Sequence, residues 1–171
     1  MKKAVALALI SGAMVPGLAL AADGNMSFTG NVTANTCVIN SPDLTIDMGD
    51  VPASALATPG ARAGQTRFEI ALTGCTEGVA KVAAKFESGT ADLSTGRLGL
   101  TADVNQAKNV QIAIYDMADA ENKFGQAPPT SSYQDIISGS ATLRYSAWYV
   151  ATGVATVGTA NAAATYTLAY E

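Results

Sequence analysis

The chain has 171 residues, enough for one ordinary domain and not comfortably for two, and it carries 10 Lys and Arg against 14 Asp and Glu. With no histidine and no basic cluster, it lacks the imidazole chemistry of nucleophile triads and zinc sites and the electrostatic footprint of a nucleic-acid-binding protein. A net charge of −4 also disfavours binding to anionic lipid, and we interpret this charge as an aid to solubility.

Residues 1–21 have the pattern of a secretory signal peptide. Two lysines precede an apolar stretch over residues 4–18, and the small residues Ala19 and Ala21 fit a peptidase cleavage site. The alternative, a transmembrane helix, needs about 20 unbroken apolar residues, whereas Pro16-Gly17 interrupts this stretch. We expect cleavage before residue 22, export from the cytoplasm and a mature net charge of −6.

The segment that follows, residues 22–32, alternates like a β-strand although it lies at the very start of the mature chain. Met26 and Phe28 are separated by polar residues, and the alternation ends shortly before Cys37. A strand in this position could pair with its own fold or with another chain.

Two cysteines, Cys37 and Cys75, are expected to form a disulfide, because export implies an oxidising compartment. The alternatives are a metal pair, for which no histidine is available, and a reactive thiol. A ring of this size predicts roughly 4 kcal/mol of stabilisation in the chain-entropy account.

Apolar and polar residues alternate along six runs, which places the apolar set of each run on one face of a sheet. Gly, Pro, Asp and Ser separate the runs, and no long helical period is found, so we predict an all-β sandwich. A seventh run over 79–86 is less clear, and the alanine-rich residues 53–57 could form a short helical turn. The six runs are 26–33, 44–48, 67–72, 110–115, 143–149 and 165–170.

No arrangement of acidic residues predicts an enzyme, and we expect no catalytic, metal or cofactor site. Three carboxylates over residues 43–50 lie near turns, where solvated side chains are ordinary. Asp116, Asp119 and Glu121 follow a predicted strand but lack the glycine and bidentate glutamate of a calcium loop. An exported hydrolase that uses carboxylates alone is the enzymatic alternative.

Three parts of the mature chain have a more specific pattern than alternation alone. The first is Phe28-Thr29-Gly30-Asn31-Val32 shortly before the first cysteine. The second is the stretch from Ala55 to Cys75, and the third is the pair of runs 143–153 and 162–171 with the penultimate aromatic Tyr170. Together these parts resemble chaperone–usher pilin subunits of the type 1 fimbrial major subunit family, and the resemblance covers nearly the whole mature chain.

The resemblance implies an incomplete immunoglobulin-like sandwich that lacks its last strand and is completed by donor-strand addition. It implies a structural subunit of a cell-surface fimbria that supports adhesion and is exported through the periplasm. Its partners would be further copies of the chain, a periplasmic pilus chaperone and an outer-membrane usher. The expected organisation is a signal peptide (1–21), a donor-strand extension (22–33) and a pilin domain (34–171).

The resemblance also assigns residues to the donor strand and to the groove that receives it. The alternative for each of these residues is ordinary β-core packing. With only six residues between the expected cleavage site and Phe28, the extension is short for the family. The donor-strand residues are Gly24, Met26, Phe28, Gly30 and Val32, and the groove-lining and chaperone-facing residues of the last strand are Tyr166, Leu168, Tyr170 and Glu171.

The alternative function is a single-domain adhesin, or a minor or tip pilin, that binds a host glycan at a surface near Trp148 and Tyr149. Tip adhesins of the family usually carry an additional receptor-binding domain, for which we expect no room in this chain. Trp148 is otherwise a packed or half-exposed position of the sheet.

Overall fold

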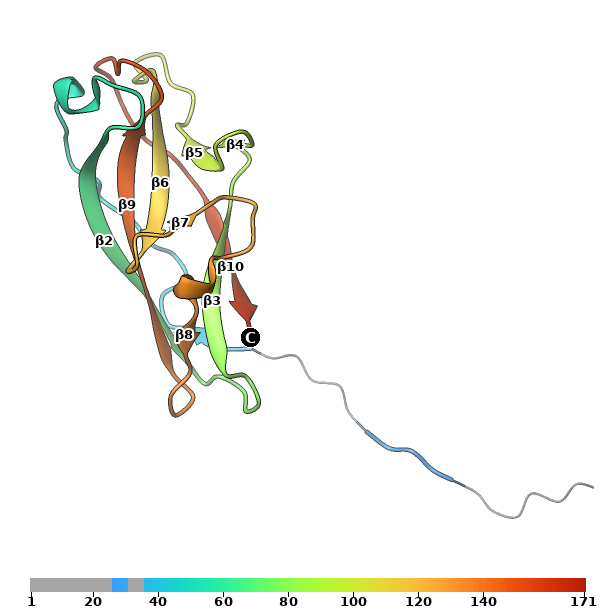
Figure 1. The fold of residues 1–171 in the computed structure, drawn as a ribbon. Coiled ribbons are helices and arrows are strands. Elements are labelled where there is room, and N and C mark those ends of the chain that lie inside the picture. The colour runs from blue at the N-terminus through green and yellow to red at the C-terminus, as the bar shows by residue number, and fades with distance from the viewer. Residues whose placement is uncertain (1–25, 31–35) are drawn as a thin grey trace, which may run out of the picture. The chain divides into compact units, whose positions relative to one another are not determined.

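The computed structural model describes residues 26–30 and 36–171, and in the second range the chain forms two antiparallel sheets that pack face to face (Figure 1). Among these residues no helix is long and apolar enough to cross a membrane. The elements are β1 (Val38–Ile39), η1 (Ala53–Leu56), β2 (Arg62–Thr73), β3 (Lys81–Glu87), β4 (Ala91–Asp92), β5 (Arg97–Gly99), β6 (Val110–Asp116), β7 (Glu121–Asn122), η2 (Thr130–Ser132), β8 (Gln134–Asp135), β9 (Ala141–Ala151) and β10 (Thr165–Tyr170).

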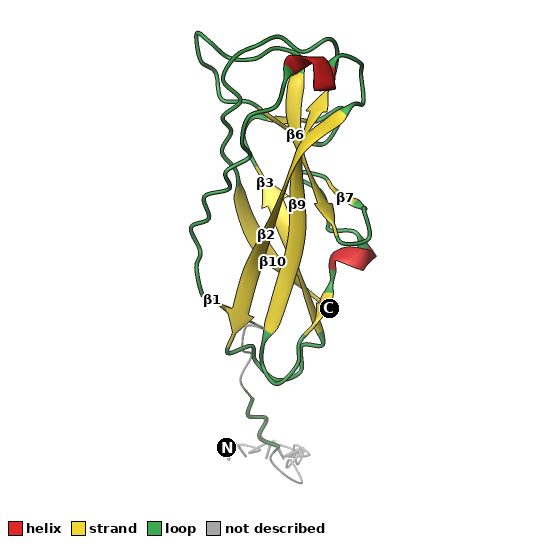
Figure 2. Cartoon of the chain, turned by 90° about the vertical axis from the view of Figure 1, so that its left-hand side faces the viewer, coloured by secondary structure: helices red, strands yellow, loops and turns green. Residues whose placement is uncertain are grey.

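The larger sheet has the strand order β1-β2-β9-β6-β5-β4, with β7 also paired to β6. Its long central pair is β2 and β9, in which Ile70 lies opposite Leu143. The smaller sheet has the order β10-β3-β8, so the last strand of the chain is an edge strand (Figure 2). One side of β10 therefore has no strand partner.

An aromatic contact ties the two sheets together. The ring of Phe86 on β3 meets the ring of Tyr145 on β9 edge to face, with 5.1 Å between centroids. The Tyr145 hydroxyl is buried, and it accepts a hydrogen bond from the backbone N–H of Ala84 at 2.9 Å. Burial raises the pKa of Tyr145 to about 12, so this hydroxyl stays neutral and hydrogen-bonded in the core.

Most of the predicted strands are confirmed. β2, β6, β9 and β10 contain the runs 67–72, 110–115, 143–149 and 165–170, β3 accounts for the less clear run, and η1 lies in the alanine-rich stretch. The structure also joins Cys37 to Cys75, as predicted. The disulfide fixes the start of β1 next to the end of β2.

The predicted strand over 44–48 is wrong for the single chain. Ile46 and Met48 do pack against the core, which explains their alternation, but residues 41–51 have no partner strand. Residues 26–30 are not a strand either, and the rest of that predicted run lies outside the described residues. The expected signal peptide also lies outside them.

Candidate functional site

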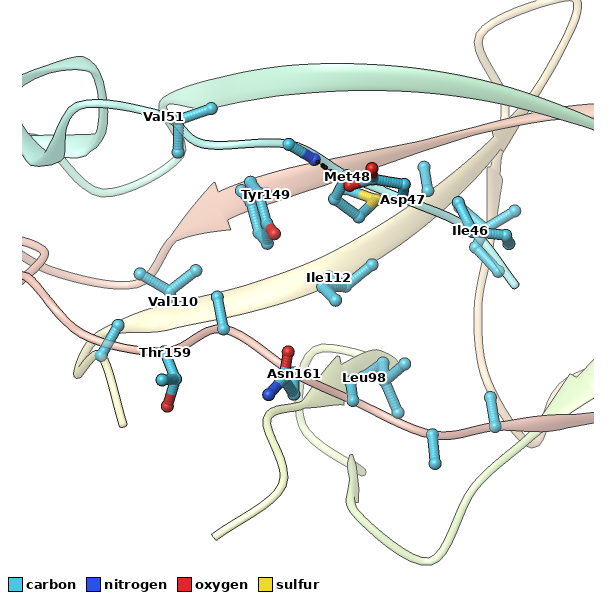
Figure 3. Close-up of a pocket in the computed structure, with 18 of the residues that line it drawn as sticks. Ile46, Asp47, Met48, Val51, Leu98, Val110, Ile112, Tyr149, Thr159 and Asn161 are labelled. Carbon is cyan, nitrogen blue, oxygen red and sulfur yellow. Dashed lines mark hydrogen bonds between the residues drawn. The ribbon is translucent and has the colours of Figure 1, made fainter. Parts of the chain in front are cut away.

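A groove with a volume of about 1150 Å³ runs between two segments that are far apart in the sequence (Figure 3). One edge is the segment 42–51, between β1 and η1, and the other is the segment 155–166, which leads into β10. Small-molecule pockets usually measure about 300–1,000 Å³, so the groove is large for such a ligand. An elongated occupant fits its dimensions better.

The floor of the groove is the apolar face of the larger sheet. Val110 and Ile112 on β6, Tyr149 on β9 and Leu98 on β5 lie between the two edges (Figure 3). Because side chains alternate along a strand, Val110 and Ile112 point to the same face of β6. The side chains at the bottom of the groove therefore belong to the hydrophobic core itself.

The backbone along both edges lacks strand partners on the groove side. β10 pairs with β3 alone, and residues 155–161 make backbone hydrogen bonds to loops and to η1 but pair with no named strand. Within the described range no backbone–backbone hydrogen bond involves residues 41–51. Such edges present rows of N–H and C=O groups that can pair with another strand. The groove thus offers backbone hydrogen bonds on two sides and an apolar floor.

Two tyrosine hydroxyls of β10 make hydrogen bonds at the end of the groove nearest the disulfide, and one of them joins the two edges. Tyr166 donates a hydrogen bond to the carbonyl oxygen of Pro42 at 3.1 Å. Tyr170 accepts one from the backbone N–H of Cys37 at 2.8 Å. At the opposite end the groove reaches Val157, where the N–H of Ala155 donates to the carbonyl oxygen of Leu56 in η1 at 3.1 Å but no described bond joins the edge over 42–51 to the edge over 155–166. We call these the tied end and the open end.

The groove is acidic on one edge and otherwise uncharged. Asp43, Asp47 and Asp50 line it, and its described lining contains no lysine or arginine. Burial raises the pKa of Tyr149, and the charges of Asp50 and Asp47 raise it further. Burial likewise raises the pKa of Tyr166, with a smaller contribution from Asp43. The site is suited to an uncharged apolar segment and unsuited to an anion.

Residues of the expected donor strand are exposed where the structure describes them. Met26 and Phe28 are 81% and 86% exposed, and Gly30 is exposed as well. Gly24 and Val32 lie outside the described residues. Two large apolar side chains at alternate positions are thus open to solvent in the single chain, which is unfavourable unless another surface covers them.

The residues expected on the last strand are divided by the structure. Tyr166 lines the groove, whereas Leu168 and Tyr170 are half-buried against the core beyond the tied end. Glu171 is exposed, but its carbonyl oxygen accepts hydrogen bonds from the N–H groups of Ala80 and Lys81 at 3.0 and 2.9 Å. The last residue is therefore held against the start of β3.

Sequence reasoning missed the edge over residues 155–164 and the floor residues Leu98 and Val110 as parts of a site. The edge is rich in alanine and threonine and shows no clear period, so it carries no strand signal. A run of small uncharged residues just before a terminal strand is the one feature that could have indicated it.

The carboxylates considered as a calcium loop each have protein partners. Asp116 accepts hydrogen bonds from two backbone N–H groups and two serine hydroxyls. Asp119 pairs with Arg62 at 2.9 Å, and Glu121 pairs with Arg97 at 2.7 Å. Each carboxylate thus has its own partners, and among the described residues no three such side chains are grouped so that they could hold a metal ion.

Trp148 lies on the outer face of the larger sheet, where the guanidinium of Arg62 covers its ring at 5.1 Å from the centroid. The same guanidinium lies 4.7 Å from the ring centroid of Tyr115. Trp148 is half-buried, so the packed interpretation holds. A sugar that stacked on this ring would have to displace a cation already in contact with it.

The chain and its fold are similar to those of known proteins. A family model described as Fimbrial protein matches residues 26–171. The chain is 39% identical over 169 residues to the major fimbrial subunit SMF-1 of Stenotrophomonas maltophilia (strain K279a), covering 93% of this chain and 99% of that protein. It is 33% identical over 172 residues to the type-1 fimbrial protein, A chain, of Escherichia coli (strain K12), covering 97% and 93%. The fold is similar to that of the P pilus rod subunit PapA, with a TM-score of 0.62 and 20% identity over 79% of this chain and 99% of that one.

Proposed function

Since the chain belongs to the fimbrial protein family, we propose that it is a structural subunit of a bacterial surface fimbria and that it polymerises by lending residues 22–33 to the groove of a neighbouring copy. The observation that carries this proposal is the groove itself, whose apolar floor lies between two edges without strand partners. A strand placed there would pair with backbone on both sides and cover the core.

The length of the extension matches the length of the groove. The series from Gly24 to Val32 has nine residues and would span about 26 Å as a strand at about 3.3 Å per residue. The groove edge over 42–51 has ten residues, one more than the series. An extension that is short for the family is thus long enough for this groove.

The side chains of the extension suit the floor. Met26 and Phe28 alternate with polar residues, so both can face the floor while their neighbours face solvent. Each large apolar side chain that becomes buried contributes about 1.5–3 kcal/mol. Gly30, two positions on, permits a close approach between backbones. The whole series 24–32 carries no charge, which agrees with the uncharged floor and the acidic edge.

An open groove with unpaired edges is an aggregation hazard for a chain in transit. We infer that a periplasmic chaperone covers the groove by strand addition until an outer-membrane usher adds the subunit to the fibre. The apolar floor and the free side of β10 support this inference, because either a chaperone strand or a donated strand could use them.

A peptide-binding experiment tests the donated strand. A labelled synthetic peptide with the sequence of residues 22–33 is titrated into the full mature chain, and anisotropy reports the affinity. We expect the wild-type peptide to bind and a Phe28→Asp peptide to bind at least about tenfold more weakly, since it loses the burial of one aromatic side chain.

The matched control is a Thr29→Asp peptide, whose changed side chain lies on the opposite face of the strand and should leave the affinity near that of the wild type. Equal binding by the Phe28→Asp and wild-type peptides would show that the segment does not occupy the groove.

A further inference from the structure

Two exposed valines lie at the open end of the groove. Val104 is 99% exposed and Val157 is 86% exposed, and both line one shallow hollow formed by two neighbouring loops. Val157 also lines the groove, so the hollow is continuous with it. We call Val104 and Val157 the valine pair.

The loops that carry the valine pair are fixed to one another. The N–H of Ala107 donates to the carbonyl oxygen of Thr159 at 2.9 Å, and the N–H of Thr159 donates to that of Asn105 at 2.8 Å. Gly158 makes this approach possible, because a β-carbon there would overlap the carbonyl oxygen of Asn105. The apolar side chains are therefore presented by a defined surface, which is what an interface requires.

Exposed apolar side chains are also found at the opposite end of the sandwich, where the chain enters the fold. Val38, next to the first cysteine, is 61% exposed. Ile137 is 73% exposed on a turn whose Gly139 carbonyl oxygen accepts a hydrogen bond from the N–H of Cys75 at 3.0 Å. Val38 and Ile137 thus both belong to the disulfide end of the molecule.

The length of the connecting chain brings these two ends together in a fibre, an inference that rests on the proposed function. Only four residues separate Val32, the last residue of the donor series, from Cys37. Even fully extended, they allow at most about 18 Å between those two residues. The Tyr166–Pro42 bond closes the groove at the tied end, and we infer that the donated strand continues into its own fold at the open end, beside Val157.

We propose that the valine pair of one copy contacts the disulfide end of the next copy, through Val38 and Ile137 of that copy. The partner is a second copy of this chain because the donated strand brings that end within reach. The contact buries apolar side chains that are exposed in the single chain and fixes the angle between successive subunits.

A cross-linking experiment on assembled fibres tests this contact. The full chain with Val104→Cys and Ile137→Cys is expressed in the source bacterium as its only copy, and sheared fibres are treated with a short bismaleimide. The native cysteines are joined to each other and do not react. We expect a ladder of covalent oligomers. The control pairs Val104→Cys with Met117→Cys, an exposed residue between β6 and β7, and should give none.

A second variant distinguishes the effect of the proposed contact from the effect of donated-strand binding. Val104→Asp should leave the affinity for the 22–33 peptide within about twofold of wild type while fibre yield falls roughly tenfold, and Val104→Ile should retain the yield. Normal fibres from Val104→Asp, or fibres without a ladder from the cysteine pair, would overturn the proposed contact. A wild-type chain that neither binds the peptide nor forms fibres would refute the proposed function instead.

Discussion

The hydroxyl of Tyr166 donates a hydrogen bond to the carbonyl oxygen of Pro42, and this single contact spans the groove from one edge to the other. The two residues lie 124 positions apart in the sequence. A strand that enters the groove to its tied end has to replace this bond with backbone pairing. In the proposed assembly, the contact is therefore a small barrier to the donated strand.

Removing the hydroxyl should make that path easier. In Tyr166→Phe the ring still lines the groove, and we expect the free energy of unfolding to fall by no more than about 1 kcal/mol. The association rate of the 22–33 peptide should rise, as measured by stopped-flow fluorescence. Tyr133→Phe is the matched control, because its hydroxyl makes no hydrogen bond to the described chain. An unchanged rate in Tyr166→Phe would mean that the bond is no barrier.

The ring of Phe86 should be the most costly one to remove. It contacts Phe68, Phe124, Tyr145 and Tyr166, which joins both sheets to the groove. Phe86→Ala is expected to destabilise the fold by about 3–5 kcal/mol, measured by urea unfolding. The exposed Leu93 provides the comparison, since Leu93→Ala should change the stability by less than about 0.5 kcal/mol. A loss below about 1 kcal/mol in Phe86→Ala would contradict the packing described here.

Loss of the disulfide should lower stability without abolishing the groove. Replacement of Cys37 and Cys75 by serine is expected to cost about 4 kcal/mol in the free energy of unfolding, because the unfolded chain gains freedom. The effect is measured by denaturant unfolding of the variant against oxidised wild type. Reduced wild type should behave like the variant, and a variant as stable as the oxidised protein would contradict the prediction.

The carboxylate of Asp116 should make the fold sensitive to acid. Burial by itself would raise the pKa of Asp116, but hydrogen bonds from Ser131, Ser132 and two backbone N–H groups outweigh it, and the pKa falls below its ordinary value. A carboxyl with a depressed pKa in the folded state contributes stability above its unfolded pKa, about 3.9, and loses it as the pH falls through the folded value.

Urea unfolding at pH 7 and at a series of pH values below about 4 measures this contribution. Asp116→Asn should be less stable at neutral pH and should lose less stability on acidification than wild type. Ser132→Ala removes one of these hydrogen bonds and moves the folded pKa of Asp116 towards the unfolded value, so this variant should lose less stability on acidification than wild type and complete the loss at a higher pH. Parallel pH profiles for the wild type and the Asp116→Asn variant would show that Asp116 contributes no acid sensitivity.

Period-2 alternation predicted the central strands well because these strands bury one whole face. Alternation predicted a strand that includes Val110, Ile112 and Ile114, and these residues lie on β6 with their side chains in the core. The segment 44–48 has the same pattern and is no strand in the single chain. Alternation reports where side chains are buried, whereas a strand also needs a neighbour for its backbone.

The site could be predicted only in part. The same alternation placed Tyr166, Leu168 and Tyr170 together, yet only Tyr166 lines the groove, because the tied end lies just beyond it. β4, β7 and β8 have two residues each, too few to show any period. The edge over 155–164 is fixed by hydrogen bonds to distant loops, such as that from Thr101 to Asn161, which no local pattern records.

The disulfide has a mechanical consequence if the chain is held in a fibre by its first residues, as we propose. Tension on the donated strand would then enter the fold immediately before Cys37, where β1 pairs with β2 over two residues only. Without a covalent link, such a short ladder would peel open one bond at a time under a steady pull. The bond to Cys75 passes the load directly to the end of β2, the longest strand of the sandwich, whose twelve residues would have to shear together.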